Sequence, residues 1–178
     1  LSAILLAFLL YELHSRVLTK VFQTVLITPH FMSWVVVSCM LYAFLHPTNG
    51  LLNQFLVNVR HVDMVDWYGK PEAWPGILTI ASVWKHVGMD SVVYYAALMG
   101  FDHSLIEAAQ VDGARKWKIN FKIVLPSLIP MIVILTIMKI GNIFRADFGL
   151  FSQLPSDIGT LYTTTDVIDT YVFRSMRR

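Results

Sequence analysis

The chain has 178 residues, of which 56% are hydrophobic and only 15% charged, with a formal net charge of +2. Soluble globular domains are less apolar, at about 45–50%, and more charged, at about 25%, so this composition argues against a soluble enzyme, a disordered segment or a nucleic-acid-binding protein. The single cysteine, Cys39, excludes an internal disulfide and a cysteine-cluster zinc site, which leaves an integral membrane protein or a part of one.

Four apolar stretches follow one another along the chain. Residues 1–13 are strongly apolar but too short to cross a bilayer, because a spanning helix needs roughly 20 residues at about 1.5 Å each. This stretch lacks the basic segment and the cleavage site of a signal peptide, so we interpret it as the second half of a span that begins outside this chain. Residues 24–46, 77–99 and 123–144 are each long enough for a complete span.

Lysine and arginine indicate how these spans are oriented. The segments 14–22 and 101–122 together hold six of these residues over 31 positions, whereas 47–76 and 145–173 hold three over 59 positions. Because cytoplasmic connections are enriched in lysine and arginine, we expect the first two segments inside and the other two, as outer loops, outside. The alternating order of the segments agrees, although the arginines among the last five residues run against this scheme.

Residues 101–126, FDHSLIEAAQVDGARKWKINFKIVLP, carry the most specific pattern in the chain. Ser104 and Glu107 have the spacing of a capping box, which predicts a short helix that begins at Ser104. Gly113 follows an aspartate and adopts positive φ at no steric cost, so a turn is predicted there. A second stretch, basic and aromatic, is predicted to be helical, and Pro126 lies where a new helix begins. We therefore expect a helix–turn–helix at the cytoplasmic face.

This segment resembles the EAA loop of binding-protein-dependent ABC importer permeases. The loop of that family reads E-A-A, three residues, G, nine residues and I-x-L-P, and this chain meets every spacing. Stretches at 28–36, 83–102 and 166–174 look like the branch of these permeases that imports complex sugars and oligosaccharides. For Glu107 alone, a surface amphipathic helix without a partner is the simpler interpretation, but the complete spacing argues against it.

The resemblance implies an all-α membrane protein with the helical bundle of importer-type ABC permeases, truncated at both ends to three full spans and one partial span. Such permeases have a core of six spans, pair with a second permease and receive their substrate, here a sugar, from an extracellular solute-binding protein. ATPase subunits on the cytoplasmic face hydrolyse the ATP, so the permease is expected to be no enzyme and to need no cofactor. The implied location is the bacterial plasma membrane, with several spans in contact with lipid.

The resemblance also implies which residues couple the permease to its ATPase. In the family the short helix docks into a cleft of an ATPase subunit; Glu107 would supply a charge for a partner's arginine or lysine, and Gly113 would let the chain reverse. Restart of the next span would turn a push on the loop into a tilt of residues 123–144 between inward-open and outward-open states. The coupling residues implied are Glu107, Ala108, Ala109, Gly113, Leu125 and Pro126.

The span 77–99 contains polar residues in its middle. Lys85, His86 and Asp90 interrupt the apolar run, and ionisable groups at membrane depth cost ~2.5–3.5 kcal/mol each, so they normally face protein or a wet path. Gly88 predicts a break in the helix, a feature of transport routes. Two interpretations stay open, namely pathway lining and an ion pair inside the bundle, although Lys85 and Asp90 are five residues apart, which is not ideal for a pair on one helix.

Sugars are bound by aromatic faces together with hydrogen-bonding groups. Asn142, near the end of the last complete span, is the first choice for a pathway residue. For each aromatic residue at membrane depth, packing or an interfacial position is the competing interpretation. The candidates at membrane depth are Trp34, Tyr42, Tyr94, Tyr95 and Asn142.

No catalytic or metal site is indicated, because the six histidines lack metal-binding spacings and neither a phosphate-binding glycine loop nor a nucleophile elbow occurs. Cys39 lies in an apolar span, where we expect inert packing. One alternative function is a secondary transporter driven by an ion gradient, with Lys85 and Asp90 as its coupling groups. Another is a membrane anchor or assembly protein, but the ionisable residues within 77–99 argue against it.

Overall fold

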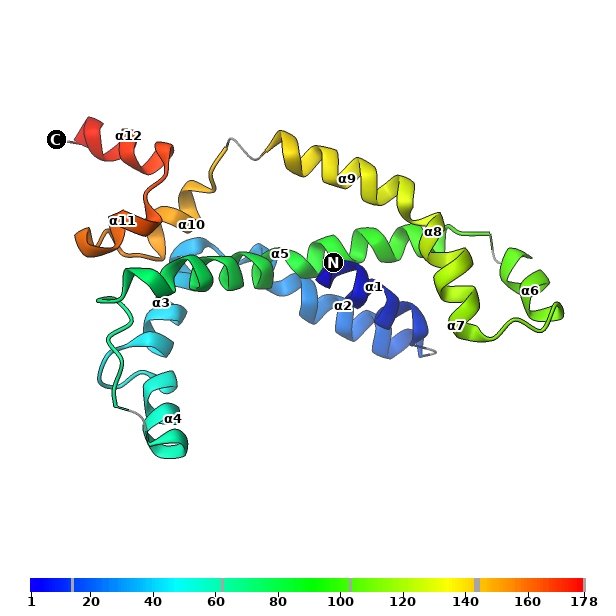
Figure 1. The fold of residues 1–178 in the computed structure, drawn as a ribbon, viewed down its shortest axis with the longest axis horizontal. Helices are drawn as coiled ribbons and strands as arrows, with labels where there is room; N and C mark the ends of the chain where they lie inside the picture. Colours follow the sequence, from blue (N-terminus) through cyan, green and yellow to red (C-terminus); the bar gives the residue numbers. More distant parts are fainter. Residues whose placement is uncertain (14, 62, 103, 143–144, 178) are drawn as a thin grey trace. The chain divides into compact units, whose positions relative to one another are not determined.

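The computed structural model describes residues 1–13, 15–61, 63–102, 104–142 and 145–177, and every regular element within these ranges is a helix or a helical turn (Figure 1). The predicted all-α class is therefore confirmed. The α-helices of eight or more residues are α1 (Ser2–Glu12), α2 (Arg16–Phe31), α3 (Trp34–Leu45), α4 (Leu51–Arg60), α5 (Trp74–Met99), α6 (Ser104–Val111), α9 (Ile129–Gly141) and α12 (Ile168–Arg177). The shorter elements are η1 (Pro71–Ala73), α7 (Lys116–Ile119), the π-helical turn η2 (Asn120–Val124), α8 (Leu125–Ser127), α10 (Phe148–Gln153), η3 (Gly159–Leu161) and α11 (Tyr162–Thr165).

The chain folds into two compact units. Unit 1 comprises Leu1–His30 and Lys85–Ile143, and unit 2 comprises Phe31–Trp84 and Phe144–Arg178. Helix α5 contributes its first part to unit 2 and the remainder to unit 1.

Unit 1 is held together by a small apolar core and by one close crossing of helices. Its buried side chains come from α1, α5 and the run from α7 to α8, and include Ala7, Leu98 and Val124, all with no exposed surface. Helix α5 passes α2 so closely that a Cβ at Gly88 would lie 1.7 Å from the carbonyl oxygen of Leu26. Helix α5 runs through Gly88 without a break, so the predicted interruption is wrong, and this glycine serves helix packing instead.

An α-helical segment, α8, begins at Leu125 with Pro126 in its first turn, as predicted, but the chain before it is already helical. The chain is helical from Lys116 to Ser127 and then bends by 48° before Ile129–Gly141. A proline inside an α-helix collides with the carbonyl four residues earlier, here Lys122. The π turn lies directly before Pro126, and in it the N–H of Leu125 donates to the carbonyl of Asn120, five residues back. This wider turn accommodates the proline within one helical run.

Unit 2 packs around Trp74 and the leucines of α10 and η3. Trp74, Leu154 and Leu161 have no exposed surface, and Leu150 is 5% exposed. Asn53 of α4 is also buried, and its amide joins the chain segments on both sides of this helix. The unit therefore combines an apolar core with a buried polar anchor.

Within the described residues, no single helix meets the length and hydropathy expected of a membrane-spanning helix. Two pairs of helices reach the expected length and hydropathy when the two helices of a pair are counted together across the break between them. These pairs are Arg16–Phe31 with Trp34–Leu45 and Lys116–Ser127 with Ile129–Gly141. These pairs overlap the predicted spans 24–46 and 123–144. The predicted span 77–99 lies within α5, whose interior charges lower its hydropathy.

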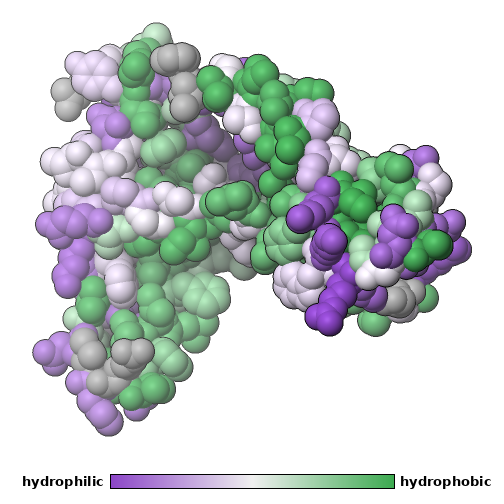
Figure 2. Space-filling view, turned by 45° about the vertical axis from the view of Figure 1, so that its right-hand side comes forward, coloured by the Kyte–Doolittle hydropathy of each residue, from purple (hydrophilic) through white to green (hydrophobic). Residues whose placement is uncertain are grey.

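Apolar side chains cover much of the exposed surface of α9, which appears as a mostly green surface in Figure 2. The exposed fractions of six of these side chains range from 48% to 63%. A helix that exposes so many large apolar groups has a surface suited to lipid or to partner helices. These residues are Ile129, Val133, Ile134, Ile137, Met138 and Ile140.

Candidate functional site

The short helix predicted in the segment 101–126 exists as α6 in unit 1, and it begins at the predicted residue. The Oδ1 atom of Asp102 accepts a hydrogen bond of 2.9 Å from the backbone N–H of Ser104. Ser104 is itself the first helical residue. The side chain that caps the start of α6 is therefore that of Asp102. The predicted capping box, in which Ser104 would be the capping residue, is wrong.

Gly113 ends α6 in the predicted turn. Its φ is +72°, and its N–H donates to the carbonyl of Gln110 at 3.0 Å. The N–H of Ala114 donates to the carbonyl of Ala109 at 2.9 Å. These two bonds form a Schellman motif, which satisfies carbonyls at the end of a helix and requires a left-handed residue at the glycine position. The reversal of the chain at Gly113 is therefore built into the backbone.

The two sides of α6 differ in their surroundings. Ser104, Glu107, Ala108 and Val111 recur at helical spacing and are all exposed; we call them the outward face of α6. Glu107 makes no hydrogen bond or ion pair with any residue that the structure describes. On the other side, Ile106 and Ala109 pack against the core of unit 1, so the alanine pair is divided between the two sides.

The segment after α6 joins it to the rest of unit 1. Ile119 and Val124 are buried, and the Nδ2 atom of Asn120 donates to Oε1 of Glu12 at the end of α1, at 2.9 Å. Leu125 is half-buried and Pro126 is exposed, both within the run that leads to α9. The segment after α6 therefore contacts α1 and continues into α9.

Exposed aromatic side chains accompany the basic residues of this segment. Trp117 and Phe121 are 76% and 58% exposed, and their rings stack with centroids 5.5 Å apart. Figure 2 shows hydrophilic side chains gathered at this end of unit 1, where α6 and α7 come forward. The residues of the predicted cytoplasmic loop 101–122 thus form a surface that is both charged and apolar.

Two charged residues of α5 contact neighbouring helices. Lys85 is 6% exposed, and its Nζ donates to the carbonyl oxygens of Pro29 at 3.4 Å and His30 at 3.0 Å. These carbonyls belong to the last turn of α2, where helical partners are lacking, so Lys85 caps that helix. The carboxylate of Asp90 instead forms an ion pair with Lys139 of α9. This pair links α5 to α9.

The predicted sugar-binding aromatics take part in packing. In unit 2, Nε1 of Trp34 donates a hydrogen bond of 2.9 Å to Oδ2 of Asp147. The Trp34 ring also packs directly against Gly149, since a Cβ at Gly149 would lie only 2.3 Å from Cδ1 of Trp34. Tyr94 is 8% exposed within the core of unit 1, and Tyr42 stacks edge-on against Tyr68 in unit 2.

Two other predicted residues lie nearer the surface. The Nδ2 atom of Asn142 donates to the carbonyl of Met138 at 3.1 Å, so the side chain caps its own helix. Tyr95 is half-buried beside the core of unit 1. Cys39 is exposed on α3, so the expectation that it is packed inside is wrong.

A pocket in unit 2 was not predicted from the sequence. It lies between α3, α10, α11 and α12, and Tyr162 and Arg174 form part of its wall. These residues belong to a loop predicted to be an outer connection and to a basic terminus, and neither pattern indicated a cavity. Within the part of the chain that the structure describes, no group of three histidine, cysteine, aspartate or glutamate side chains is arranged to hold a metal ion.

Comparison with known families gives this arrangement its context. Residues 3–175 match the family described as the binding-protein-dependent transport system inner membrane component. The chain belongs to this family. The predicted resemblance is thereby confirmed, and the match extends over nearly the whole chain.

Individual relatives agree with this membership. The chain is 32% identical over 170 residues to the polygalacturonan/rhamnogalacturonan transport system permease protein YteP of Bacillus subtilis, covering 96% of this chain and 52% of YteP. It is 28% identical to the sn-glycerol-3-phosphate transport system permease protein UgpA of Escherichia coli O157:H7, covering 84% of this chain and 50% of UgpA. The chain thus spans about half the length of the curated relatives it matches.

A solved structure agrees with the chain in fold. It is a bacterial ABC transporter involved in the import of the acidic polysaccharide alginate, and its matching chain has 37% identity and a TM-score of 0.89. The match covers 97% of this chain and 59% of that chain. The helical architecture is therefore that of an importer permease.

Proposed function

We propose that the chain is part of a transmembrane permease subunit of an ATP-driven, binding-protein-dependent importer in the bacterial plasma membrane. ATP would be hydrolysed by partner ATPase subunits, and a second permease would complete the pathway. Family membership supports this proposal, as does the similarity to YteP and to the alginate transporter. A further structure of the alginate transporter includes a periplasmic protein with bound alginate pentasaccharide, which supports a solute-binding protein as the donor of substrate.

The observation that carries the coupling role is the outward face of α6. Its four residues are exposed, and Glu107 has no partner among the residues that the structure describes. An unpaired carboxylate on a short rigid helix suits a basic group of an ATPase cleft. Ala109 and Ile106 on the opposite side would pass the motion to the core of unit 1. From there the bent run to α9 would tilt as the ATPases close, which biases the permease between inward-open and outward-open states.

The proposed substrate is a sugar, and an oligosaccharide in particular. The names of the relatives include polygalacturonan, rhamnogalacturonan and alginate. Among the predicted pathway residues, Asn142 is exposed, and Asp90 is 29% exposed in its pair with Lys139. Lys85, Trp34 and Tyr94 have the contacts of packing residues, and we propose a supporting role for them beside the pathway.

The coupling proposal is tested by Glu107→Ala in the full-length permease, assembled with its partners in proteoliposomes. We expect ATP-driven sugar uptake and co-purification with the ATPase to fall roughly tenfold or more, because a charge-assisted contact is lost. Glu72→Ala removes another exposed carboxylate, from the predicted outer loop, and serves as the matched control. Unchanged uptake and unchanged co-purification in Glu107→Ala, and also in the double variant with Gly113→Ala, would overturn the coupling role.

A further inference from the structure

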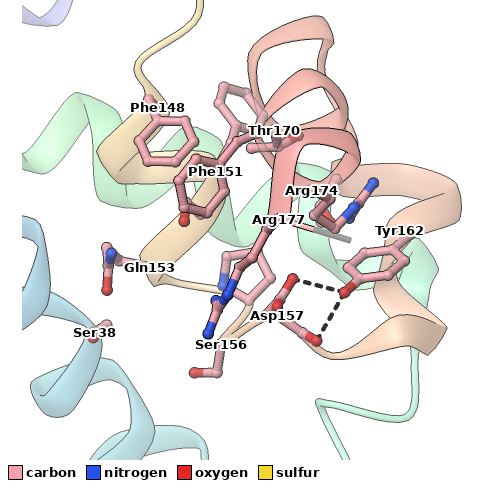
Figure 3. Close-up of a pocket in the computed structure, with 14 residues that line it drawn as sticks. Ser38, Phe148, Phe151, Gln153, Ser156, Asp157, Tyr162, Thr170, Arg174 and Arg177 are labelled. Atoms are coloured by element: carbon pink, nitrogen blue, oxygen red, sulfur yellow. Dashed lines mark hydrogen bonds between the residues drawn. The ribbon is translucent and has the colours of Figure 1, made fainter.

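Unit 2 contains a pocket of about 420 Å³ whose lining residues all belong to that unit (Figure 3). Small-molecule sites typically have volumes of about 300–1,000 Å³. Helices α3, α10, α11 and α12 and the connection after α10 contribute its walls. The pocket is therefore large enough for a ligand and is formed by secondary structure on most sides.

The walls of the pocket differ in chemistry. Three phenylalanines form the apolar part; Phe148 and Phe173 meet edge to face with centroids 5.0 Å apart, and Phe151 lies beside Phe148. Facing them is a polar part made of amide, hydroxyl, carboxylate and guanidinium groups. Aromatic faces opposite hydrogen-bonding groups are the combination that binds a sugar ring. The polar part consists of Ser38, Ser152, Gln153, Ser156, Asp157 and Arg177.

The polar wall is held in place by its own hydrogen bonds. The hydroxyl of Tyr162 donates to Oδ1 of Asp157 at 2.6 Å and to the carbonyl of Asp157 at 3.0 Å. This bond to the carboxylate raises the pKa of Tyr162, so the phenol keeps its proton at physiological pH. Ser156 and Asp157 have φ values of 54° and 56°, a left-handed conformation that these bonds maintain.

The charges around the pocket leave one guanidinium without a partner. Arg174 forms an ion pair with Asp166 and lies 3.6 Å above the Tyr162 ring centroid, so its charge is already compensated. Arg177 extends from α12 into the pocket, and it makes no hydrogen bond or ion pair within the described ranges (Figure 3). A guanidinium offers five N–H donors in a planar fork that fits a carboxylate. Arg177 is exposed, so its N–H groups are open to an acceptor from solvent, and an anionic acceptor fits the planar fork best.

We propose that this pocket is a saccharide subsite in which Arg177 binds the carboxylate of a uronic acid unit while the phenylalanines contact the sugar ring. The inference deepens the proposed function and rests on it, because it names acidic oligosaccharides as the substrate class. Residues 145–173 are predicted to lie outside, so the subsite would take up sugar on the outer side of the membrane. Asp157 would accept a bond from a sugar hydroxyl at its second carboxylate oxygen.

The test uses the full-length permease assembled with its ATPase, second permease and solute-binding protein in proteoliposomes. The probe is trigalacturonate, and its fully methyl-esterified form is the uncharged comparison. Arg177→Gln is expected to raise KM for trigalacturonate uptake roughly tenfold or more and to leave uptake of the ester unchanged. Arg145→Gln removes an exposed arginine from the same unit but outside the pocket, and it should behave as wild type.

A second measurement separates this inference from the proposed function. Binding of trigalacturonate to the permease in nanodiscs, without the solute-binding protein, is followed by saturation-transfer NMR. Loss of this binding in Arg177→Gln, with unchanged thermal unfolding, supports the subsite. Absence of sugar uptake by the wild-type transporter would overturn the proposed function but would leave this support for the subsite in place. Uptake with normal KM in Arg177→Gln, or equal binding of both sugars, overturns the subsite and leaves the transporter role intact.

Discussion

Helix α6 and helix α4, which carries Asn53, both lie outside the predicted spans, but they use their polar side chains in opposite ways. Asn53, at 1% exposure, has its amide nitrogen within 3.2 Å of the carbonyl oxygens of His46, Pro47 and Val65. Its amide oxygen accepts bonds from the N–H of Val65 at 3.3 Å and from Nε1 of Trp67 at 3.1 Å. Its polar groups are therefore satisfied inside unit 2.

Helix α6 keeps its polar groups for the outside. Local hydrogen bonds, at Asp102 and at Gly113, satisfy backbone groups at the two ends of α6. The residues of its outward face are exposed to solvent. A buried and satisfied side chain stabilises one conformation, because breaking its bonds leaves donors and acceptors without partners. An exposed carboxylate contributes little to folding and is available to a partner. The comparison thus separates a structural anchor from a proposed docking surface, and the following variants test that separation.

The largest expected effect on stability is that of Asn53→Ala. The change strands several buried backbone groups and the Trp67 ring N–H, which should lower the free energy of unfolding by about 3–4 kcal/mol. Asn58→Ala on the exposed side of the same helix is the control, with an expected change within about 0.5 kcal/mol. Thermal unfolding of the full-length permease in detergent measures the stability of both variants. If the two variants were equally stable, Asn53 would not be a structural anchor.

An intermediate effect is expected at Gly113. A Cβ there meets no atom within 4 Å, so Gly113→Ala is penalised only by the positive φ, by about 1–2 kcal/mol. Gly113→Asn should restore most of the loss, since asparagine tolerates this conformation. Gly76→Ala, in the helical first turn of α5 and equally open, should be neutral or slightly stabilising.

Hydrogen exchange at the Ala114 amide, which donates to Ala109, reports the integrity of this turn. Faster exchange is expected in Gly113→Ala, and near-normal exchange in Gly113→Asn. If Gly113→Ala and Gly76→Ala were equally harmless, the left-handed turn would not be needed to hold α6.

The smallest effect is expected at Tyr68, which follows α4 in the chain. Its hydroxyl is buried without a hydrogen-bond partner among the described residues, and burial raises the pKa of Tyr68 to about 12. Tyr68→Phe should therefore be neutral or stabilising by up to about 1 kcal/mol at pH 7. Because the unfolded tyrosine ionises near pH 10, its contribution to stability is constant below that pH and decreases between pH 10 and 12. The free energy of unfolding, measured between pH 10 and 12, should therefore decrease less in Tyr68→Phe than in the wild type. If Tyr68→Phe were destabilised at pH 7, the hydroxyl would have to form a hydrogen bond.

The sequence predicted the elements whose signals are local. The start of α6 at Ser104 and the turn at Gly113 follow from short-range spacing, and the structure has both. The identity of the cap was wrong because Asp102 and Ser104 are both good capping residues, and only the backbone path decides between them.

Features that depend on tertiary contacts were not predictable in this way. Asp90 pairs with Lys139, 49 residues away, and Gly88 lies against Leu26 of another helix, so neither partner is encoded in its neighbourhood. Asn53 stands in the polar segment 47–76, whose sequence predicts an outer loop, and no local pattern distinguishes it from an exposed asparagine. Hydropathy also shows how long an apolar stretch is but not where the helix changes direction, so the bend after Ser127 could not be predicted from it.

The most direct test of the central claim is cross-linking from two adjacent alanines. Ala108 is on the outward face of α6, whereas Ala109 packs against the core of unit 1. Single cysteines are introduced at each position in the assembled transporter, with the exposed Cys39 replaced by serine. The account predicts that Ala108→Cys cross-links to the ATPase subunit and that Ala109→Cys does not. Failure of Ala108→Cys to cross-link, or equal yields from both positions, would contradict a coupling surface on this face.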